Sequence, residues 1–145
     1  MIAKLVLAEL IAPEKIKQLL NDFTEWAYAR PDIQAVALVG SYARNAATAT
    51  SDVDLVVIAN NPELYLNDQS WLERFGEIHQ QQGEDYGLVT SIRVWYSDGR
   101  EVEYGITSER WAAMPLDEGT RQVISDGMRI LFERGDLLSR HQTGN

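Results

Sequence analysis

Two aspartates one residue apart, Asp52 and Asp54, stand at the start of the apolar run "DLVVIA" (residues 54–59). Alternate residues of a strand point to the same side, so we expect the two carboxylates to lie together. Such charges repel each other unless something positive lies between them. A hard divalent cation does this, and Mg²⁺ is commonly held by one or two carboxylates together with substrate phosphates. The pair therefore predicts a site that binds a metal ion together with the phosphates of a nucleotide.

A second group of candidate residues lies upstream, where "GSYAR" follows another apolar run. Gly40 and Ser41 are expected to end a strand and begin a short helix. Glycine lets the backbone approach a ligand closely, and the free N–H groups with the Ser41 hydroxyl can hold phosphate oxygens. Arg44, one helical turn further on, can add a charge-assisted contact to the same anion.

The block from Gly40 to Ala59 resembles the signature of the DNA polymerase beta-type nucleotidyltransferases: G-S-Y-A-R, a spacer, then S-D-V-D and an apolar strand. The sequence departs from this pattern at Asn45, where the family often has glycine. Asparagine tolerates left-handed backbone angles, so the change is mild. The tail "PLDEGTRQVISDGMRIL" is also similar to that of small stand-alone bacterial members, although more weakly.

The resemblance implies transfer of a nucleoside monophosphate from a nucleoside triphosphate, most simply ATP, to an acceptor hydroxyl with release of pyrophosphate. In that family an Asp-x-Asp pair and a third carboxylate on a later strand bind two metal ions, here Mg²⁺ or Mn²⁺. The best match for the third acid is Glu103, which would also help to remove the acceptor proton. The resemblance thus assigns the metal and catalytic roles to Asp52, Asp54 and Glu103, and the phosphate-binding roles to Gly40, Ser41 and Arg44.

The elements that must position these residues follow from the hydrophobic pattern. Helical periodicity is found over residues 13–30, 68–79 and 117–127. Strands are expected at residues 33–40, 54–59 and 128–133, and a hairpin joins 88–96 to 100–107 around Asp98-Gly99. Helices that alternate with strands, together with one hairpin, predict an α/β (α+β) nucleotidyltransferase fold: a mixed sheet with flanking helices.

The hairpin also distinguishes the two acids on its second strand. A two-residue turn at Asp98-Gly99 would place Glu103 opposite Val94 and Glu101 opposite Tyr96. Both acids then point to one side of the sheet. Glu101 would be exposed near the hairpin tip, whereas Glu103 would lie deeper, where an unpaired carboxylate is costly.

The composition predicts one globular domain over residues 1–145 with an ordinary soluble character. The chain has no cysteine, which fits a reducing cytoplasm, and no stretch typical of a membrane span. A formal net charge of −9 argues against a nucleic-acid partner, because backbone-driven binding needs clustered Lys and Arg. No Walker loop is present, which argues against P-loop hydrolysis.

The acceptor is left open between two alternatives. One is a small molecule such as an aminoglycoside, with a second copy of the chain completing the site. Such relatives usually carry an extra helical acceptor domain, and 145 residues leave no room for one. The other is an antitoxin-like role, in which the chain binds or nucleotidylates a helical HEPN-type toxin. A homodimer or a complex with a helical partner is expected in either case.

Overall fold

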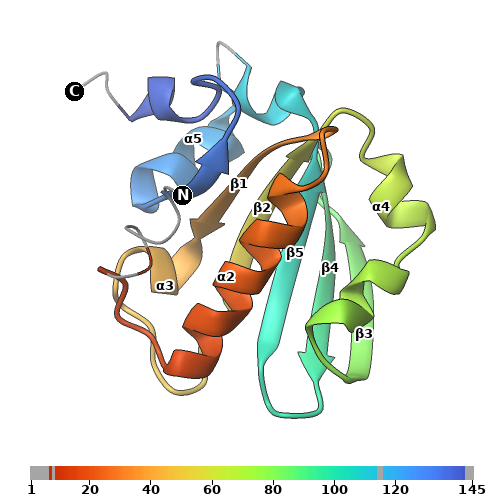
Figure 1. The fold of residues 1–145 in the computed structure, drawn as a ribbon. Helices are drawn as coiled ribbons and strands as arrows, with labels where there is room; N and C mark the ends of the chain where they lie inside the picture. Colours follow the sequence, from red (N-terminus) through yellow and green to blue (C-terminus); the bar gives the residue numbers. More distant parts are fainter. Residues whose placement is uncertain (1–6, 8, 114–115, 143–145) are drawn as a thin grey trace.

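The computed structural model describes residue 7, residues 9–113 and residues 116–142. Six strands form one mixed sheet in the order β3-β4-β5-β2-β1-β6, with helices on both faces (Figure 1). The predicted fold class is confirmed. In chain order the elements are α2 (Glu14–Tyr28), β1 (Ile33–Val39), α3 (Gly40–Ala43), β2 (Val53–Ala59), α4 (Glu63–Asn67), the 3-10 helix η1 (Ser70–Phe75), β3 (Ile78–Asp85), β4 (Val89–Tyr96), β5 (Glu101–Thr107), the 3-10 helix η2 (Glu109–Ala112), α5 (Glu118–Asp126), β6 (Arg129–Glu133) and the 3-10 helix η3 (Ser139–His141).

The centre of the sheet consists of the two most apolar strands, β1 and β2, which pair in antiparallel fashion. β2 is also parallel to β5, which makes the sheet mixed. Both strands are buried over five or more of their seven residues, as expected of strands covered on both faces. None of the helices in the described ranges is long and apolar enough to cross a membrane.

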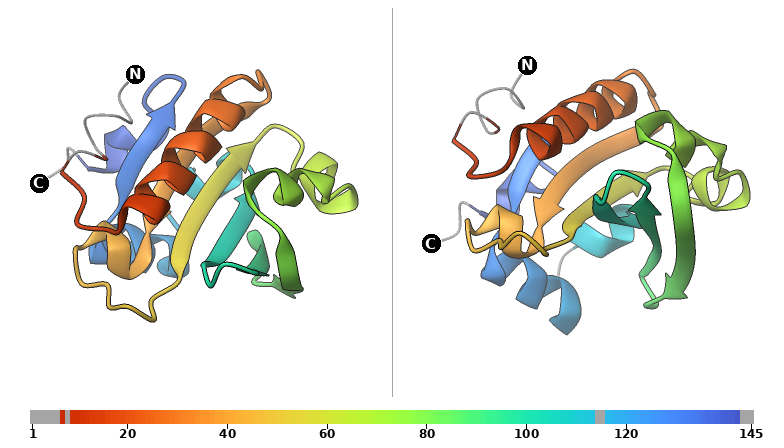
Figure 2. Two further views of the ribbon diagram at one scale, coloured as in Figure 1. Left: turned by 60° about the horizontal axis from the view of Figure 1, so that its bottom comes forward. Right: turned by 90° about the horizontal axis from the view of Figure 1, so that it is seen from below.

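One face of the sheet is covered by α2, which lies across it as a separate layer (Figure 2, right). The helix begins after Pro13 and turns its apolar stripe, including Leu20 and Phe23, into the larger core. Trp26 stacks on Trp71 with ring centroids 5.2 Å apart, in the same core. These tryptophans therefore pack the fold and are not free stacking platforms.

The opposite face carries a smaller core, with Trp111 of η2 and Met128 against alternate residues of β1 and β2. Helix α5 lies on this side (Figure 2, right). β3, at the sheet edge, is exposed along almost its whole length. On this second face the side chains of Arg93 in β4 and of Glu101 and Glu103 in β5 are half-buried.

The helix predicted over residues 68–79 is wrong in extent. The structure has only the 3-10 helix η1, preceded by the Asp68 carboxylate that accepts from the Ser70 backbone N–H at 3.1 Å. The helix ends at Phe75, Gly76 follows it, and the chain then pairs with β4 from Ile78 onward as β3. Pairing with a neighbouring strand outweighs the helical periodicity there. Neither α4 nor β3 was predicted.

The hairpin between β4 and β5 is confirmed, but its predicted register is wrong. The Tyr96 N–H donates to the Arg100 carbonyl at 2.8 Å, so the loop has three residues, 97–99. Gly99 takes φ +96°, as in the common three-residue loop that places a glycine in the left-handed region. The pairing moves by one residue: Arg93 stands opposite Glu103, and Val94 stands opposite Val102. This register places charge against charge and apolar against apolar.

Candidate active site

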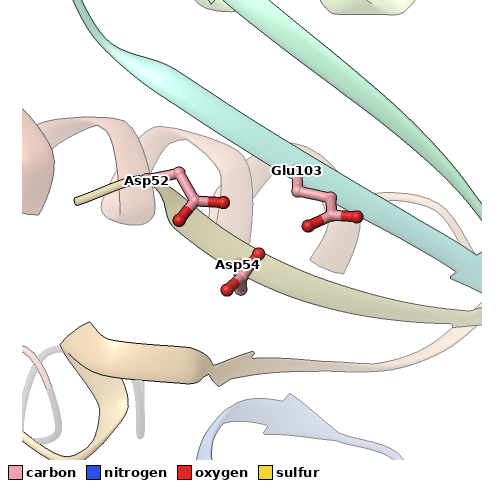
Figure 3. A group of neighbouring side chains, drawn as sticks. All are labelled: Asp52, Asp54 and Glu103. Carbon is pink, nitrogen blue, oxygen red and sulfur yellow. The ribbon is translucent and has the colours of Figure 1, made fainter. Parts of the chain in front are cut away.

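The structure brings the three predicted acids together on the second face of the sheet. Asp52, Asp54 and Glu103 each offer one carboxylate oxygen, and these oxygens all lie within 4.8 Å of one another. The three side chains converge from the start of β2 and from β5 (Figure 3). All three are half-buried, so they are accessible from solvent while held within the fold.

The convergence follows from two simple features of the sheet. Asp52 immediately precedes β2, and strand alternation puts its side chain on the same face as Asp54. The parallel pairing of β2 with β5 places Asp54 beside Glu103. Residues that are paired across a ladder point to the same face, so strand pairing alone places the Glu103 carboxylate beside Asp54.

Gly40 lies against this cluster at the junction of β1 and α3. Its φ is +74°, in the left-handed region that favours glycine. A Cβ atom at this position would lie 2.3 Å from Oδ2 of Asp54. Glycine is therefore required at position 40 for two reasons: the positive φ angle and the close approach of the Asp54 carboxylate.

The turn after β1 is held in place by one local and two long-range hydrogen bonds. The Ala46 N–H donates to the Ser41 carbonyl at 2.9 Å, and Nε of Arg129 in β6 donates to the Ala43 carbonyl at 2.7 Å. Asn45 adopts φ +54°, the left-handed conformation expected of it, and its side chain accepts from the Ile11 N–H at 3.2 Å. Ser41 is half-buried in this turn, and Arg44 is exposed beside it.

A fourth charged residue, Arg93 of β4, is part of the cluster and was missed by the sequence analysis. Its Nη1 lies 3.0 Å from Asp52 Oδ2 and 2.5 Å from Glu101 Oε2, and its Nη2 lies 2.9 Å from Glu103 Oε2. The available signal was a lone charge inside the apolar run "SIRVWY", but only the corrected register places it opposite Glu103.

The expectation that Glu101 is exposed near the hairpin tip is wrong, because this side chain is half-buried and paired with Arg93. Its side chain is 30% exposed, against 20% for Glu103, and it makes the shortest of the three contacts with Arg93. Burial lowers the pKa of Arg93, but the hydrogen bond to Glu101 and the charges of Glu103 and Asp52 outweigh it and raise the pKa overall. Arg93 is firmly cationic.

Asp54 is the acid of the cluster that Arg93 does not contact in the ion pairs of the described residues. Burial first, and then the neighbouring carboxylates of Glu103 and Asp52, raise the pKa of Asp54 to about 8. The ligand-free site thus favours a proton on Asp54 near neutral pH. A cation that binds there would displace this proton.

A cleft of about 390 Å³ opens beside the carboxylates, between the sheet and α5. Asp54, Glu103, Gly40 and Arg44 line its charged end. The rest of its lining is largely apolar and includes Val56 of β2, Leu88 and Val89 at the start of β4, Trp111 of η2 and Val123 of α5. Two further carboxylates, Asp117 and Asp126, line it at the two ends of α5. A cleft with an apolar body and a charged end suits a nucleotide, whose base is apolar and whose phosphates are anionic.

The donor set of the site fits a hard divalent cation. Its three candidate ligands are all carboxylate oxygens, which Mg²⁺ and Mn²⁺ prefer over the nitrogen and sulfur ligands of softer metals. Asp52, Asp54 and Glu103 are therefore the residues that would hold such an ion.

This fold, with its Gly-Ser turn and clustered acids, is that of a nucleotidyltransferase-superfamily domain. The family model described as "Streptomycin adenylyltransferase" matches residues 14–114, well over half of the chain. The chain belongs to the streptomycin adenylyltransferase family.

Two proteins with known names are similar to this chain. The chain is 24% identical over 135 residues to an aminoglycoside 6-adenylyltransferase of Staphylococcus aureus, covering 86% of this chain and 46% of the relative. The crystal structure of an aminoglycoside 6-adenyltransferase from Bacillus subtilis shares the fold, with a TM-score of 0.54 and 19% identity over 70% of this chain and 37% of that one. The chain thus spans about half the length of the curated relative it matches.

Proposed function

We propose that this chain transfers the adenylyl group of ATP to a hydroxyl of a small-molecule acceptor and releases pyrophosphate. The observation that carries the proposal is the convergence of three carboxylate oxygens within 4.8 Å at the charged end of the cleft. Membership of an adenylyltransferase family supports the same reaction and favours ATP among the triphosphates.

In this reaction the acceptor oxygen attacks the α-phosphorus, a new P–O bond forms, and the bond to the bridging oxygen of the β-phosphate breaks. We assign receipt of the acceptor proton to Glu103, the triad member on β5, whose half-buried carboxylate lines the cleft. A divalent ion held by Asp52, Asp54 and Glu103 would supply positive charge to the phosphates and to the leaving pyrophosphate. Electrostatic stabilisation of this kind is commonly a large part of the rate enhancement.

The phosphate-binding roles fall to the turn after β1. Gly40 brings the backbone beside Asp54, and the N–H groups that open α3 with the Ser41 hydroxyl are donors for the β and γ phosphates. Arg44 lines the same end of the cleft and adds a cation. The apolar body of the cleft, against Trp111 and α5, would receive the base.

For the acceptor, we propose a cationic aminosugar of the aminoglycoside class. The curated relative is named for its action on an aminoglycoside. The chain carries a formal net charge of −9, and Glu101 adds a further carboxylate beside the triad. A negative surface attracts a polycationic acceptor and raises its local concentration.

The test is transfer of label from α-labelled ATP, GTP, CTP and UTP in Mg²⁺, with streptomycin and other aminoglycosides as acceptors. We expect a labelled aminoglycoside product with ATP and an equimolar release of pyrophosphate. Asp54→Asn should form no product, whereas Glu63→Gln, an exposed acid on α4, should match wild type. Product from Asp54→Asn at the wild-type rate would overturn the proposed role of the triad.

A further inference from the structure

Arg93 is the feature of the site that metal-assisted transfer leaves unexplained. Its guanidinium donates to Asp52 and Glu103, two of the three proposed ligands, at 3.0 Å and 2.9 Å. A rigid planar fork that bridges carboxylates in this way is an arrangement that arginine, unlike lysine, is built to make. In the absence of a metal ion, Arg93 neutralises charge that would otherwise drive these two acids apart.

Arg93 and a divalent cation would compete for the same carboxylates, Asp52 and Glu103. Mg²⁺ binds its oxygen ligands at about 2.0–2.1 Å in a near-octahedral arrangement. A guanidinium that stays within 3.0 Å of Asp52 and Glu103 oxygens would place a second positive charge a few ångströms from that ion. Like charges this close repel strongly in a half-buried site. Occupation by metal therefore favours movement of the Arg93 head group.

Glu101 offers a place for that head group to go. It makes the shortest contact with Arg93, at 2.5 Å, and it does not belong to the triad. It precedes Glu103 by two residues on β5, so its side chain points to the same face, one step nearer the hairpin tip. A change of side-chain rotamer along this open face would keep the Arg93–Glu101 pair and free the other two acids.

We propose that Arg93 is a resident counter-ion of the triad, which holds Asp52 and Glu103 in place without metal and withdraws onto Glu101 when a divalent ion binds. This inference rests on the proposed function, because it uses the same three acids as metal ligands. Arg93 acts through these carboxylates and is a positioning residue. Its positive charge lowers the affinity of the triad for a divalent ion, because the ion must displace Arg93 from two of the three carboxylates.

The inference predicts opposite changes in Mn²⁺ affinity for substitutions of Arg93 and of Glu101. Arg93→Gln removes the competing charge, so Mn²⁺ should bind roughly tenfold tighter or more. Arg93→Lys keeps the charge but loses the fork, so its affinity should lie closer to wild type than that of Arg93→Gln. Glu101→Gln takes away the alternative partner and leaves Arg93 on the triad, so Mn²⁺ should bind several-fold more weakly. A purely structural role for Arg93 predicts weaker binding in all three variants.

The experiment is calorimetric titration of Mn²⁺ into each protein at one pH and ionic strength. Arg74→Gln and Glu63→Gln, exposed residues of η1 and α4, make the same charge changes away from the cluster and should match wild type. Unchanged or weaker binding by Arg93→Gln overturns the inference while leaving the metal seat intact. If Arg93→Gln does not fold, Glu101→Gln decides, and binding as tight as wild type overturns the inference. Failure of wild type itself to bind Mn²⁺ overturns the metal seat of the proposed function.

Discussion

Gly40 lies directly against the carboxylate of Asp54. A Cβ on Gly40 would meet Oδ2 of Asp54 at 2.3 Å, and Val39, the residue before Gly40, is paired with Asp54 across the β1–β2 ladder. The Asp54 carboxylate therefore occupies the space that a Cβ on Gly40 would need, so the turn that begins α3 packs closely against the central acid of the triad. A substitution that displaces the turn should therefore also displace the carboxylate of Asp54.

Gly40→Ala is expected to destabilise the fold more than Gly99→Ala. Both glycines have positive φ, +74° and +96°, so both substitutions incur a backbone cost. Gly40→Ala adds an overlap with Asp54, whereas no atom of the described residues lies within 4 Å of a Cβ on Gly99. Overpacking of this kind costs typically about 1–3 kcal/mol. Urea unfolding of the two variants measures the difference, and equal losses of stability would show that the contact with Asp54 is unimportant.

The metal-free protein is expected to lose stability as the pH rises from about 4 to about 8. Asp54 has a pKa of about 8 in the folded chain and near its ordinary value of 3.8 in the unfolded chain. Between these values the folded state holds a proton that the unfolded state has released, so raising the pH favours unfolding. Asp54→Asn removes this group and should flatten the slope. Urea unfolding in EDTA at pH 5, 7 and 9 tests this, and the same slope in the variant would contradict it.

Mg²⁺ together with ATP is expected to stabilise the wild-type fold. At a hundred times the dissociation constant, the gain is about 2.7 kcal/mol. For a domain of this size the melting temperature should rise by roughly 5–10 °C. Asp52→Asn removes one of the three oxygens that converge on the seat and should abolish most of the rise. Thermal melts with and without ligands measure it, and a full shift in Asp52→Asn would mean that the nucleotide binds without this acid.

Glu103→Gln and Glu101→Gln are both expected to lower the rate of transfer, but only the Glu101→Gln loss should be reversed by Mg²⁺. Glu103→Gln should keep most of the affinity for ATP but lose about a hundredfold or more in transfer, because the proton acceptor is gone. In the ion pairs of the described residues Glu101 is linked to the triad through Arg93, so Glu101→Gln should lose less transfer activity and recover as Mg²⁺ is raised. Transfer rates over a range of Mg²⁺ concentrations separate the two. Recovery of Glu103→Gln by Mg²⁺ would remove its role in proton transfer.

Much of the site can be predicted from local rules. The placement of Asp52 with Asp54 follows from strand alternation, and the apolar runs on either side of Gly40 and Asp54 identify the central strands. The left-handed angle of Asn45 follows from its residue type in a turn. Each of these depends on covalent geometry and side-chain chemistry within a few residues, which is why the sequence suffices for them.

Only the tertiary structure decided that Arg93 belongs to the cluster. A loop of three residues in place of two, with Gly99 in the left-handed region, shifts the hairpin by one residue and places Arg93 opposite Glu103 in place of Val94. The strand at Ile78 likewise exists because β4 offers it an edge, against its own helical periodicity. Alternation along one strand is determined by the chain itself, whereas the partner across a ladder depends on how two strands pair, and a single residue in the connecting loop changes it.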